Sequence, residues 1–304
     1  MTEPITIGVD HGYAAMKTAH CSFPSGLAEY EHEPYTQKNV LCYDGKYYVV
    51  GSGRQPLQQD KTVDENYYLL TLAAIAKELE QYRLFTASLC LSVGLPLSWV
   101  GSQRESFRQY LMQNETIRFR FNGNLFQLRI VGCKVYPQGY AAIVQQLADF
   151  EGEHLLADIG NGTMNTLYMI NGKPQQGKMF TEKFGTYQCT LAVREAFMQK
   201  TQREINDAII DEVLITGTAN IAPADLKIIK GVAAEYVRDI FRRLRERGYD
   251  DSTVMLYITG GGGCLVKNFY KFSADRVKFV EDICAAAKGY EYLAEAQMKA
   301  EAKG

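Results

Sequence analysis

Three glycine-containing turns are the places in this sequence where residue types and spacing allow chemistry. They lie at residues 10–12, 158–163 and 259–263, and each follows a short apolar, partly β-branched run that predicts a strand. Glycines let backbone N–H groups approach an anion closely, and successive amides form a concave, positively polarised nest. The three turns together therefore predict a site for a phosphorylated ligand.

Two of these turns begin with an aspartate, Asp10 and Asp158. A carboxylate does not bind phosphate, but it can hold Mg²⁺ through water, because Mg²⁺ keeps several waters and takes few carboxylates. Lys17, which follows the first turn, would supply a point charge for a β-phosphate. The third turn contains four successive glycines and offers no polar side chain, so it suits a flat surface such as a purine and its ribose.

Each turn alone could be no more than a connection between two elements. Their arrangement indicates more, because an Asp–Gly turn occurs at corresponding places in both halves of the chain and a glycine-rich turn follows late in the second half. His11, inside the first turn, could contact phosphate or simply fill the loop.

The elements expected around the first turn alternate between strands and helices. We expect strands at 5–10, 16–21, 47–50, 86–93 and 131–136, helices at 64–82 and 140–150, and a hairpin over 117–130. Asn122-Gly123 forms the turn of that hairpin. Ser102 and Glu105 make a capping box that predicts the start of another helix.

The opening pattern begins again at Gly152. A strand ends in Asp158, a glycine-containing loop follows, and another strand runs to residue 170. Further on we expect helices at 188–200, 225–247 and 282–300 and a strand at 254–258. The restart predicts an internal repeat. We expect two domains, 1–150 and 151–279, with a C-terminal helix at about 280–304 that returns to the first domain.

Composition excludes several classes of protein. The chain has 304 residues, and 33 Lys and Arg against 35 Asp and Glu give a net charge of −2, which argues against a general nucleic-acid binder. Its 7 cysteines are scattered without CxxC spacing, so neither a zinc ribbon nor an iron–sulfur site is predicted. We expect no signal peptide and no membrane-spanning segment, and therefore a cytoplasmic protein.

The three turns also carry a resemblance to a known superfamily. Residues 8–17 resemble the first phosphate loop of the actin, sugar-kinase and heat-shock-chaperone superfamily, 158–163 its second phosphate loop, and 258–262 its adenosine motif. Residues 135–142 lie where that superfamily has its first connecting segment. The resemblance covers nearly the whole chain, and it implies an α/β fold with two similar actin-like (ribonuclease H-like) domains and a nucleotide cleft between them.

Within that superfamily the chain most resembles bacterial actin homologues of the ParM/StbA type. The similar features are the short length, residues 93–96, the Pro137-Gln138 pair and residues 286–290. The resemblance implies ATP or ADP with Mg²⁺ as cofactors and assembly of the protein with itself into filaments. It also implies slow ATP hydrolysis and plasmid segregation through a DNA-bound adaptor protein of the ParR type, with no direct contact to nucleic acid or membrane.

The resemblance assigns roles residue by residue. Asp10 and Asp158 would hold the waters of Mg²⁺, and Gln138 would face the attacking water. The implied catalytic residues are Gln138 and Asp158. The implied nucleotide-binding residues are Asp10, Gly12, Tyr13, Lys17, Gly160, Asn161, Gly162, Thr163, Gly260, Gly261 and Gly262.

Two positions depart from the family pattern. Gln138 stands where ParM itself has a Glu, and a Gln can orient water but cannot accept its proton, so we expect slow hydrolysis. Asn165 stands where many relatives carry an Asp, which weakens any role of residue 165 in holding the metal.

Two other functions are open on the same fold. One is a small-molecule kinase of the sugar or pantothenate type, which would need a carboxylate to accept the proton of the substrate hydroxyl. The other is a scaffold resembling FtsA or PilM that forms no filament. The polar C-terminal tail argues against an FtsA-like membrane anchor. The arginines of 238–247 could be a solvated helix face or a contact to a neighbouring subunit or adaptor.

Overall fold

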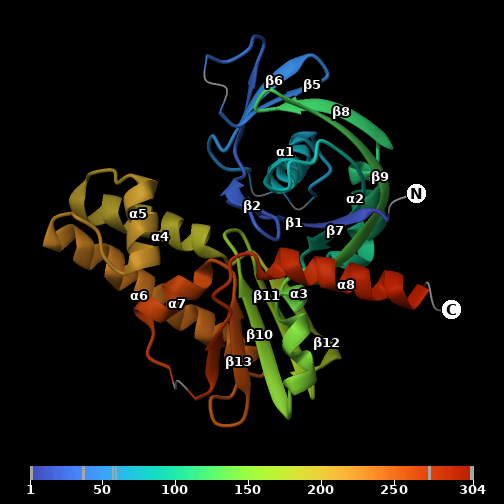
Figure 1. Cartoon of the computed structure of the whole chain (residues 1–304). Coiled ribbons are helices and arrows are strands. Elements are labelled where there is room, and N and C mark those ends of the chain that lie inside the picture. The colour runs from blue at the N-terminus through green and yellow to red at the C-terminus, as the bar shows by residue number, and fades with distance from the viewer. Residues whose placement is uncertain (1–2, 36–37, 57, 59, 273–274, 302–304) are drawn as a thin grey trace. The chain divides into compact units, whose positions relative to one another are not determined.

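The computed structural model describes residues 3–35, 38–56, 58, 60–272 and 275–301. The chain forms two compact units, one of Met1–Gln145 with Cys284–Gly304 and one of Gln146–Ile283 (Figure 1). Each unit has a β-sheet with helices, so the fold is mixed α/β.

The sheet of the first unit has nine strands among the described residues, in the order β3-β2-β1-β7-β9-β8-β5-β6-β4. The strands are β1 (Ile5–His11), β2 (Ala15–Lys17), β3 (Ser22–Pro24), β4 (Leu27–Tyr30), β5 (Val40–Tyr43), β6 (Lys46–Val50), β7 (Thr86–Leu95), β8 (Thr116–Phe121) and β9 (Asn124–Pro137). β1 runs antiparallel to β2 and parallel to β7, and β7 runs parallel to β9.

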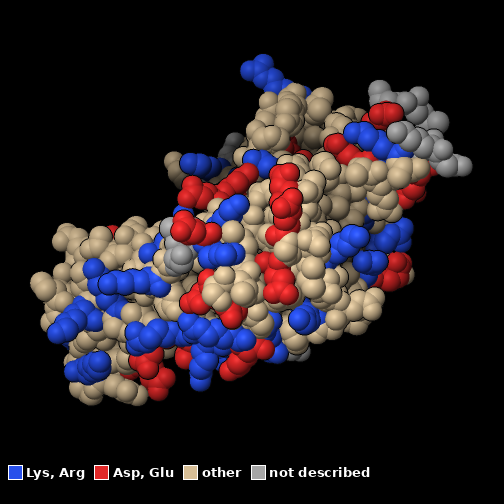
Figure 2. All heavy atoms as spheres, turned by 90° about the horizontal axis from the view of Figure 1, so that it is seen from below, with Lys and Arg blue, Asp and Glu red and all other residues tan. Residues whose placement is uncertain are grey.

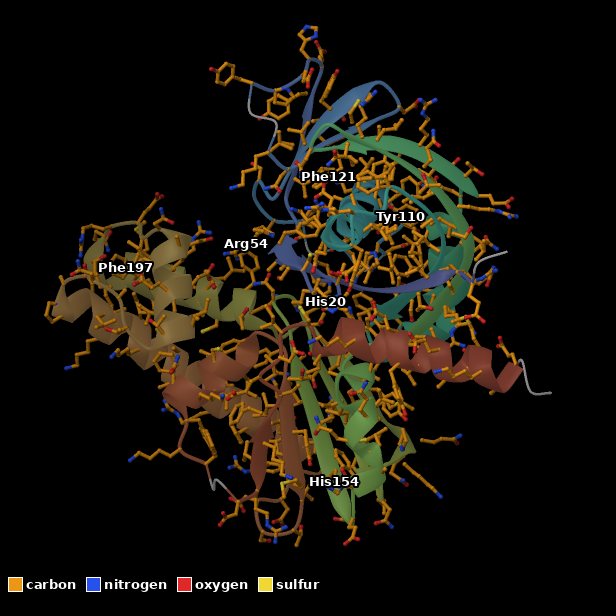
Figure 3. The ribbon with its side chains drawn as sticks, in the orientation of Figure 1. His20, Arg54, Tyr110, Phe121, His154 and Phe197 are labelled. Atoms are coloured by element: carbon orange, nitrogen blue, oxygen red, sulfur yellow. The ribbon has the colours of Figure 1, made fainter. Side chains whose placement is uncertain are left out.

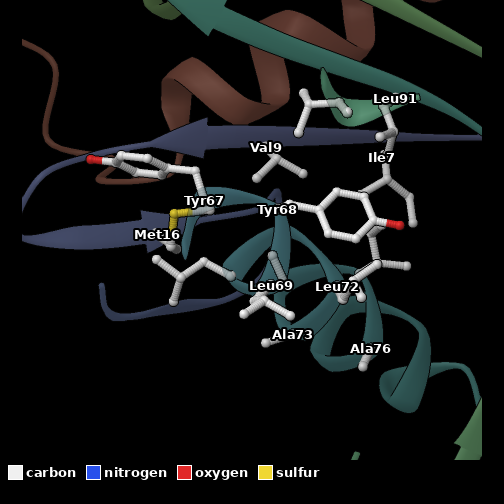
Figure 4. Close-up of a cluster of buried hydrophobic side chains, with 14 of the residues drawn as sticks. Ile7, Val9, Met16, Tyr67, Tyr68, Leu69, Leu72, Ala73, Ala76 and Leu91 are labelled. Carbon is white, nitrogen blue, oxygen red and sulfur yellow. The ribbon is translucent and has the colours of Figure 1, made fainter. Parts of the chain in front are cut away.

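The sheet curves around helix α1 (Asn66–Gln81), as Figure 1 shows. This helix is apolar on nearly every side, a pattern that only an enclosed helix can satisfy. Figure 4 shows Leu69 and Leu72 of α1 together with Ile7 and Val9 of β1 and Met16 of β2. The core of the unit thus lies directly against the hairpin of the first turn and holds that hairpin in place.

The second unit repeats the central part of the first sheet. Its strands are β10 (Glu153–Ile159), β11 (Met164–Ile170), β12 (Lys173–Glu182), β13 (Met255–Thr259) and β14 (Val277–Phe279). Their order is β12-β11-β10-β13-β14, and β10 is antiparallel to β11 and parallel to β13. The order and directions match β3-β2-β1-β7-β9, which confirms the predicted fold of two similar domains.

Four helices accompany this sheet among the residues described. They are α4 (Thr186–Thr201), α5 (Asp207–Thr216), α6 (Pro223–Glu246) and α7 (Gly262–Phe269). Seven residues of α6, from Ile229 to Leu244, are buried along one face, so the helix forms the main apolar support of the unit. The other face of α6 carries its charges.

The last helix, α8 (Ala285–Glu301), belongs to the first unit and contacts β1, β7 and the short helix α3 (Tyr140–Ile143). The approach is very close, because a Cβ atom added to Gly289 would lie 1.8 Å from the carbonyl oxygen of Ala141. A side chain at this position would therefore push α8 away from α3.

Three local predictions were wrong. Helix α2 (Val100–Leu111) begins before Ser102, since Val100 already donates to the Pro96 carbonyl, and the Ser102 hydroxyl bonds Trp99 instead of capping. The strand expected at 16–21 stops at Lys17, because the chain turns there to enter β3. The helix expected at 140–150 is α3 followed by a 3₁₀ segment, η1 (Val144–Asp149), which has no buried residue to hold an α-helical face.

Charges of both signs cover the surface. On the face shown in Figure 2, Lys and Arg atoms lie beside Asp and Glu atoms over much of the area. Two arginines of the 238–247 segment, Arg243 and Arg247, both bind Glu182 of their own unit at 2.6 and 3.0 Å. These two side chains are thus part of the structure of the second unit.

Within the described part of the chain, no helix has the length and apolarity needed to cross a bilayer.

Candidate functional site

The first turn joins β1 to β2 and places Asp10 directly opposite Lys17. Nζ of Lys17 lies 3.1 Å from Oδ2 of Asp10, and Nε2 of Gln138 donates to Oδ1 of the same carboxylate at 3.1 Å. Asp10 is only 8% exposed. The structure therefore brings three of the predicted site residues of the first unit into one cluster.

Gln138 reaches Asp10 across 127 intervening positions because of the sheet topology. β1, β7 and β9 are parallel neighbours, so their carboxyl ends meet at one edge of the sheet, where ligands of α/β proteins commonly bind. Gln138 directly follows β9, and its backbone N–H donates to Leu95 at the end of β7 at 2.8 Å. This bond fixes the backbone of Gln138 beside the end of β7, and the bond to Asp10 holds its side chain.

The electrostatics of the cluster favour an ionised Asp10. Burial acts to raise the pKa of this carboxyl, but the positive charges of Lys17 and Lys61 outweigh burial and lower the pKa below its ordinary value. Asp10 is therefore a carboxylate at neutral pH, in the form that can accept hydrogen bonds from metal-bound water.

The neighbours of Asp10 in this turn differ in their access to a ligand. Gly12 follows β1, and its N–H donates back to the Asp10 carbonyl at 3.1 Å. Tyr13 is buried, and its hydroxyl donates to the carbonyl of Gln58 at 2.6 Å, so its polar atom is used inside the unit. His11 is fully buried and hydrogen-bonds Thr71 of α1 at 2.8 Å, which makes it a core residue.

Lys61 contacts this turn from another segment, and the sequence patterns did not predict it. It lies in the segment before α1, is 2% exposed, and donates through Nζ to the backbone carbonyl of His11. Burial lowers the pKa of its ammonium group to about 8. No pattern in the sequence distinguishes it from a surface lysine, since the neighbouring residues Asp60 and Thr62 are polar.

The second turn joins β10 to β11 and places Asp158 directly opposite Asn165. Nδ2 of Asn165 lies 3.3 Å from Oδ2 of Asp158, and Oδ1 of Asn165 accepts a hydrogen bond from Thr181 at 2.8 Å. The amide N–H of Gly160 donates to the carbonyl of Thr163 at 2.8 Å and closes the turn. Asn165 thus holds the same place beside Asp158 that Lys17 holds beside Asp10.

The third turn lies against the second. Gly260 has a φ of +82°, and a Cβ atom added there would lie 2.8 Å from Oδ1 of Asp158. Gly262 is buried, and its Cβ would lie 2.2 Å from Cγ2 of Ile159. Gly261 is exposed and has open space around it. The structure therefore joins Asp158 and the polyglycine turn into one surface, on which Gly261 offers open backbone.

The start of helix α4 supports the second turn, a contact that no local sequence pattern predicted. The amides of Thr186 and Tyr187 donate to the carbonyls of Gly160 and Asn161 at 3.0 and 2.9 Å. A Cβ atom at Gly185 would lie 2.3 Å from the Asn161 carbonyl oxygen. The helix start therefore fixes the carbonyls of the turn. Gly162 and Thr163, at the end of the turn, are both buried.

The donor sets of the two turns suit Mg²⁺ held through water. Asp10 and Asp158 are carboxylates, the ligand type that can hold Mg²⁺ through water, and each accepts hydrogen bonds from side chains of its own unit. No cluster of three or more His, Cys, Asp and Glu side chains fit to hold a metal occurs among the described residues. A metal with few protein ligands and several waters matches this arrangement.

Comparisons with known proteins agree with the fold. Residues 8–140 match the family described as actin-like proteins, N-terminal domain. The archaeal actin homologue Ta0583 superposes with a TM-score of 0.78 at 18% identity, over 96% of this chain and 99% of that one. No curated protein sequence gives a significant match.

Two further structures share the fold. The Alp12 filament structure gives a TM-score of 0.69 at 16% identity, over 98% of this chain and 100% of that one. Bacillus thuringiensis ParM with ATP gives 0.66 at 12% identity, again over 98% and 100%. At such identities the similarity establishes the actin-like two-domain fold alone.

Proposed function

We propose that this chain, which has the actin-like two-domain fold, binds ATP with Mg²⁺ and hydrolyses it slowly. One observation carries the proposal: two sheets of the same strand order each place an aspartate at the same strand end, Asp10 in one unit and Asp158 in the other. Asp10 is buried and Asp158 is half-buried, and a purely structural turn requires neither carboxylate, so their repetition supports a shared ligand. Ta0583 in complex with ADP and Bacillus thuringiensis ParM with ATP support adenine nucleotides as that ligand.

Each turn has its own part in the proposed site. Gly12 and Lys17 contact the β-phosphate, residues 160–163 surround the γ-phosphate, and the backbone of Gly261, with Gly260 and Gly262 beside it, contacts the nucleoside. Asp10 and Asp158 hold waters of Mg²⁺, which when bound supplies positive charge to the phosphates. Tyr13 is buried and supports the first turn from inside the first unit.

Gln138 is the proposed catalytic side chain. Its Nε2 is engaged by Asp10, so its Oε1 faces away from that carboxylate and can accept a hydrogen bond from a water. An amide oxygen orients water without removing its proton, as the glutamine of small GTPases does. Hydrolysis is therefore slow, and the time it takes sets how long the protein stays in its ATP-bound state.

We further propose that the protein polymerises with ATP in the cytoplasm and that its filaments segregate plasmid DNA through a DNA-bound adaptor of the ParR type. Support comes from Alp12, a relative in fold whose structure is that of a filament. Direct binding to DNA is not part of the proposal, because the net charge of −2 provides no basic excess.

The test is assembly of the purified protein in the presence of Mg²⁺ with ATP, with ADP or without nucleotide. Light scattering and pelleting measure the assembly. We expect assembly with ATP, and none for Asp158→Ala under the same conditions. Failure to assemble at tens of micromolar, together with phosphate transfer to a sugar or to pantothenate, would show that the protein is a kinase. ATP binding without either activity would indicate a scaffold.

A further inference from the structure

The first unit contains a cavity of about 280 Å³ at the amino end of β1, where Ile5, Thr6 and Ile7 line it. The loop after β2, the end of α1 and helix α8 supply other parts of its lining. Asp10 lies farther along the same strand, roughly 10 Å beyond Ile7. The cavity is therefore separate from the first turn.

Part of the lining is an apolar wall made of Ile5, Ile7, Leu79, Tyr82 and Leu84. Ile7 and Leu79 are buried, whereas the other three leave much of their apolar surface exposed. Apolar side chains that line a concave site are typical of a surface that binds the apolar part of a ligand.

Two carboxyl groups also line the cavity. Glu78 of α1 is 4% exposed, accepts a hydrogen bond from the hydroxyl of Thr18 at 2.5 Å, and is hydrogen-bonded to Nδ1 of His20. Glu291 of α8 is half-buried and accepts a hydrogen bond from the amide of Gly8 at 2.9 Å. Hydrogen bonds thus hold both carboxyl groups in fixed places at the cavity.

The charges at this cavity favour a positive ligand. Burial raises the pKa of Glu291 to about 7, and the negative charges of Glu78 and Glu295 act in the same direction, while His20 acts against them. The lining residues that the structure describes include no lysine or arginine. Since an opposite charge close to a carboxyl group favours its ionised form, a cation in the cavity would stabilise ionised Glu291.

We propose that this cavity is a binding site for a small organic cation, with its ammonium group at Glu78 and Glu291 and its short apolar stem on the apolar wall. An ammonium group offers three donors to the two carboxyl groups, and the ring of Tyr82 adds attraction for a cation. A volume of about 280 Å³ is at the small end of ligand cavities, so it suits an alkylamine or one lysine side chain. The site goes beyond the proposed nucleotide function and does not depend on it.

The experiment titrates n-butylammonium into the whole chain without nucleotide, at constant ionic strength. Backbone amide chemical shifts report binding, and the amide of Gly8 is the reporter bonded directly to Glu291. We expect a Kd in the millimolar range, as befits so small a ligand. n-Butanol has the same stem without the charge and should bind about tenfold or more weakly.

Glu291→Gln keeps an acceptor for the Gly8 amide and removes the charge, so it should weaken n-butylammonium binding about tenfold. Glu115→Gln is the matched control, because Glu115 is an exposed carboxylate of the same unit, bonded to Arg129 at 2.7 Å. This control should leave the affinity unchanged. Thermal unfolding shows whether each variant is folded.

The affinity should also depend on pH. Glu291 must lose its proton to pair with the ligand, so the unchanged protein should bind n-butylammonium about tenfold more tightly at pH 8 than at pH 6. Glu78, Glu295 and His20 are the other titratable groups that act on Glu291. Glu291→Gln leaves these three in place, so loss of the pH dependence in this variant assigns it to Glu291.

A second probe identifies the source of the ligand. Nα-acetyl-lysine methylamide carries the same four-carbon ammonium stem on a peptide backbone. If it binds more tightly than n-butylammonium, the ligand is a lysine side chain of a partner protein, and if it binds more weakly, the ligand is a free amine.

Three results would overturn the inference. Equal affinities for n-butylammonium and n-butanol would make the cavity merely apolar. Normal affinity in Glu291→Gln would remove the carboxylate from recognition. No change at the Gly8 amide at tens of millimolar n-butylammonium would exclude the site, whatever the protein does with ATP.

Discussion

Nε2 of Gln138 lies 3.1 Å from Oδ1 of Asp10, although Asp10 lies in β1 and Gln138 directly follows β9. The hydrogen bond couples the proposed water-orienting residue to the proposed holder of metal-bound water. A change at either residue therefore acts on the geometry of the other.

Replacement of Gln138 by Ala removes the oriented amide without changing the charge of the first turn. We expect the rate of ATP hydrolysis to fall about 100-fold, because a misplaced reactant loses roughly that factor, while ATP affinity stays within about threefold. Single-turnover phosphate release and ATP titration measure the two quantities. Gln297→Ala, at an exposed glutamine of α8, is the control and should leave both unchanged. Equal losses in affinity and rate would contradict a role in hydrolysis.

Gly260 and Gly261 are adjacent glycines, but only Gly260 lacks room for a side chain. Gly260→Ala forces a side chain into left-handed backbone at a φ of +82° and against Asp158, so we expect a loss of at least about 1–2 kcal/mol in the free energy of unfolding. Gly261→Ala meets open space and should change stability by less than about 0.5 kcal/mol. Denaturant unfolding without nucleotide measures both. Equal stabilities would disprove the close contact between the turns.

Gly289 and Gly231 form a second pair, each within a helix. Gly289→Ala places a Cβ 1.8 Å from the Ala141 carbonyl oxygen, so α8 must shift, and we expect a destabilisation of about 2 kcal/mol or more. Gly231 of α6 has nothing within 4 Å of its added Cβ, so Gly231→Ala should stabilise the protein by about 0.5–1 kcal/mol. Opposite shifts in Tm would confirm the docking of α8, and shifts of the same sign would contradict it.

Glu291 of α8 makes stability depend on pH. Its carboxylate accepts a hydrogen bond from Gly8 at 2.9 Å, near Glu78, which in turn binds His20 (labelled in Figure 3). Burial raises the pKa of Glu291 from 4.5 to about 7. Between these values the folded state holds the proton more tightly than the unfolded chain, so stability falls as pH rises from 4.5 to 7.

The measurable consequence is a difference between the unchanged protein and Glu291→Gln. Below pH 4.5 the carboxyl is protonated in both states and the two proteins differ little. Above pH 7 the variant should gain on the order of 2 kcal/mol relative to the unchanged protein, after allowance for partial solvent exposure. Urea unfolding at pH 5 and pH 8 measures this. A difference that does not change with pH would show that Glu291 titrates normally.

The sequence by itself determined the elements and the turns. Apolar runs ending in Asp10 and Asp158 predicted the two hairpins, because a buried strand and a glycine turn are local features whose residues are neighbours in the chain. The restart at Gly152 predicted the repeated domain for the same reason. Local patterns failed where tertiary contacts decide the bounds of a helix. The helix predicted to start at Ser102 begins earlier, and over 144–149 no buried face holds an α-helix.

Only the tertiary structure decided which distant residues meet. Parallel pairing of β1, β7 and β9 brings Gln138 to Asp10, pairing of β10 with β13 brings Gly260 to Asp158, and folding of the segment before α1 buries Lys61 under the first turn. A lysine in a polar segment is indistinguishable from a surface lysine until the chain folds around it. Burial then sets its partners and its pKa, and these are properties of the surroundings that no local sequence pattern contains.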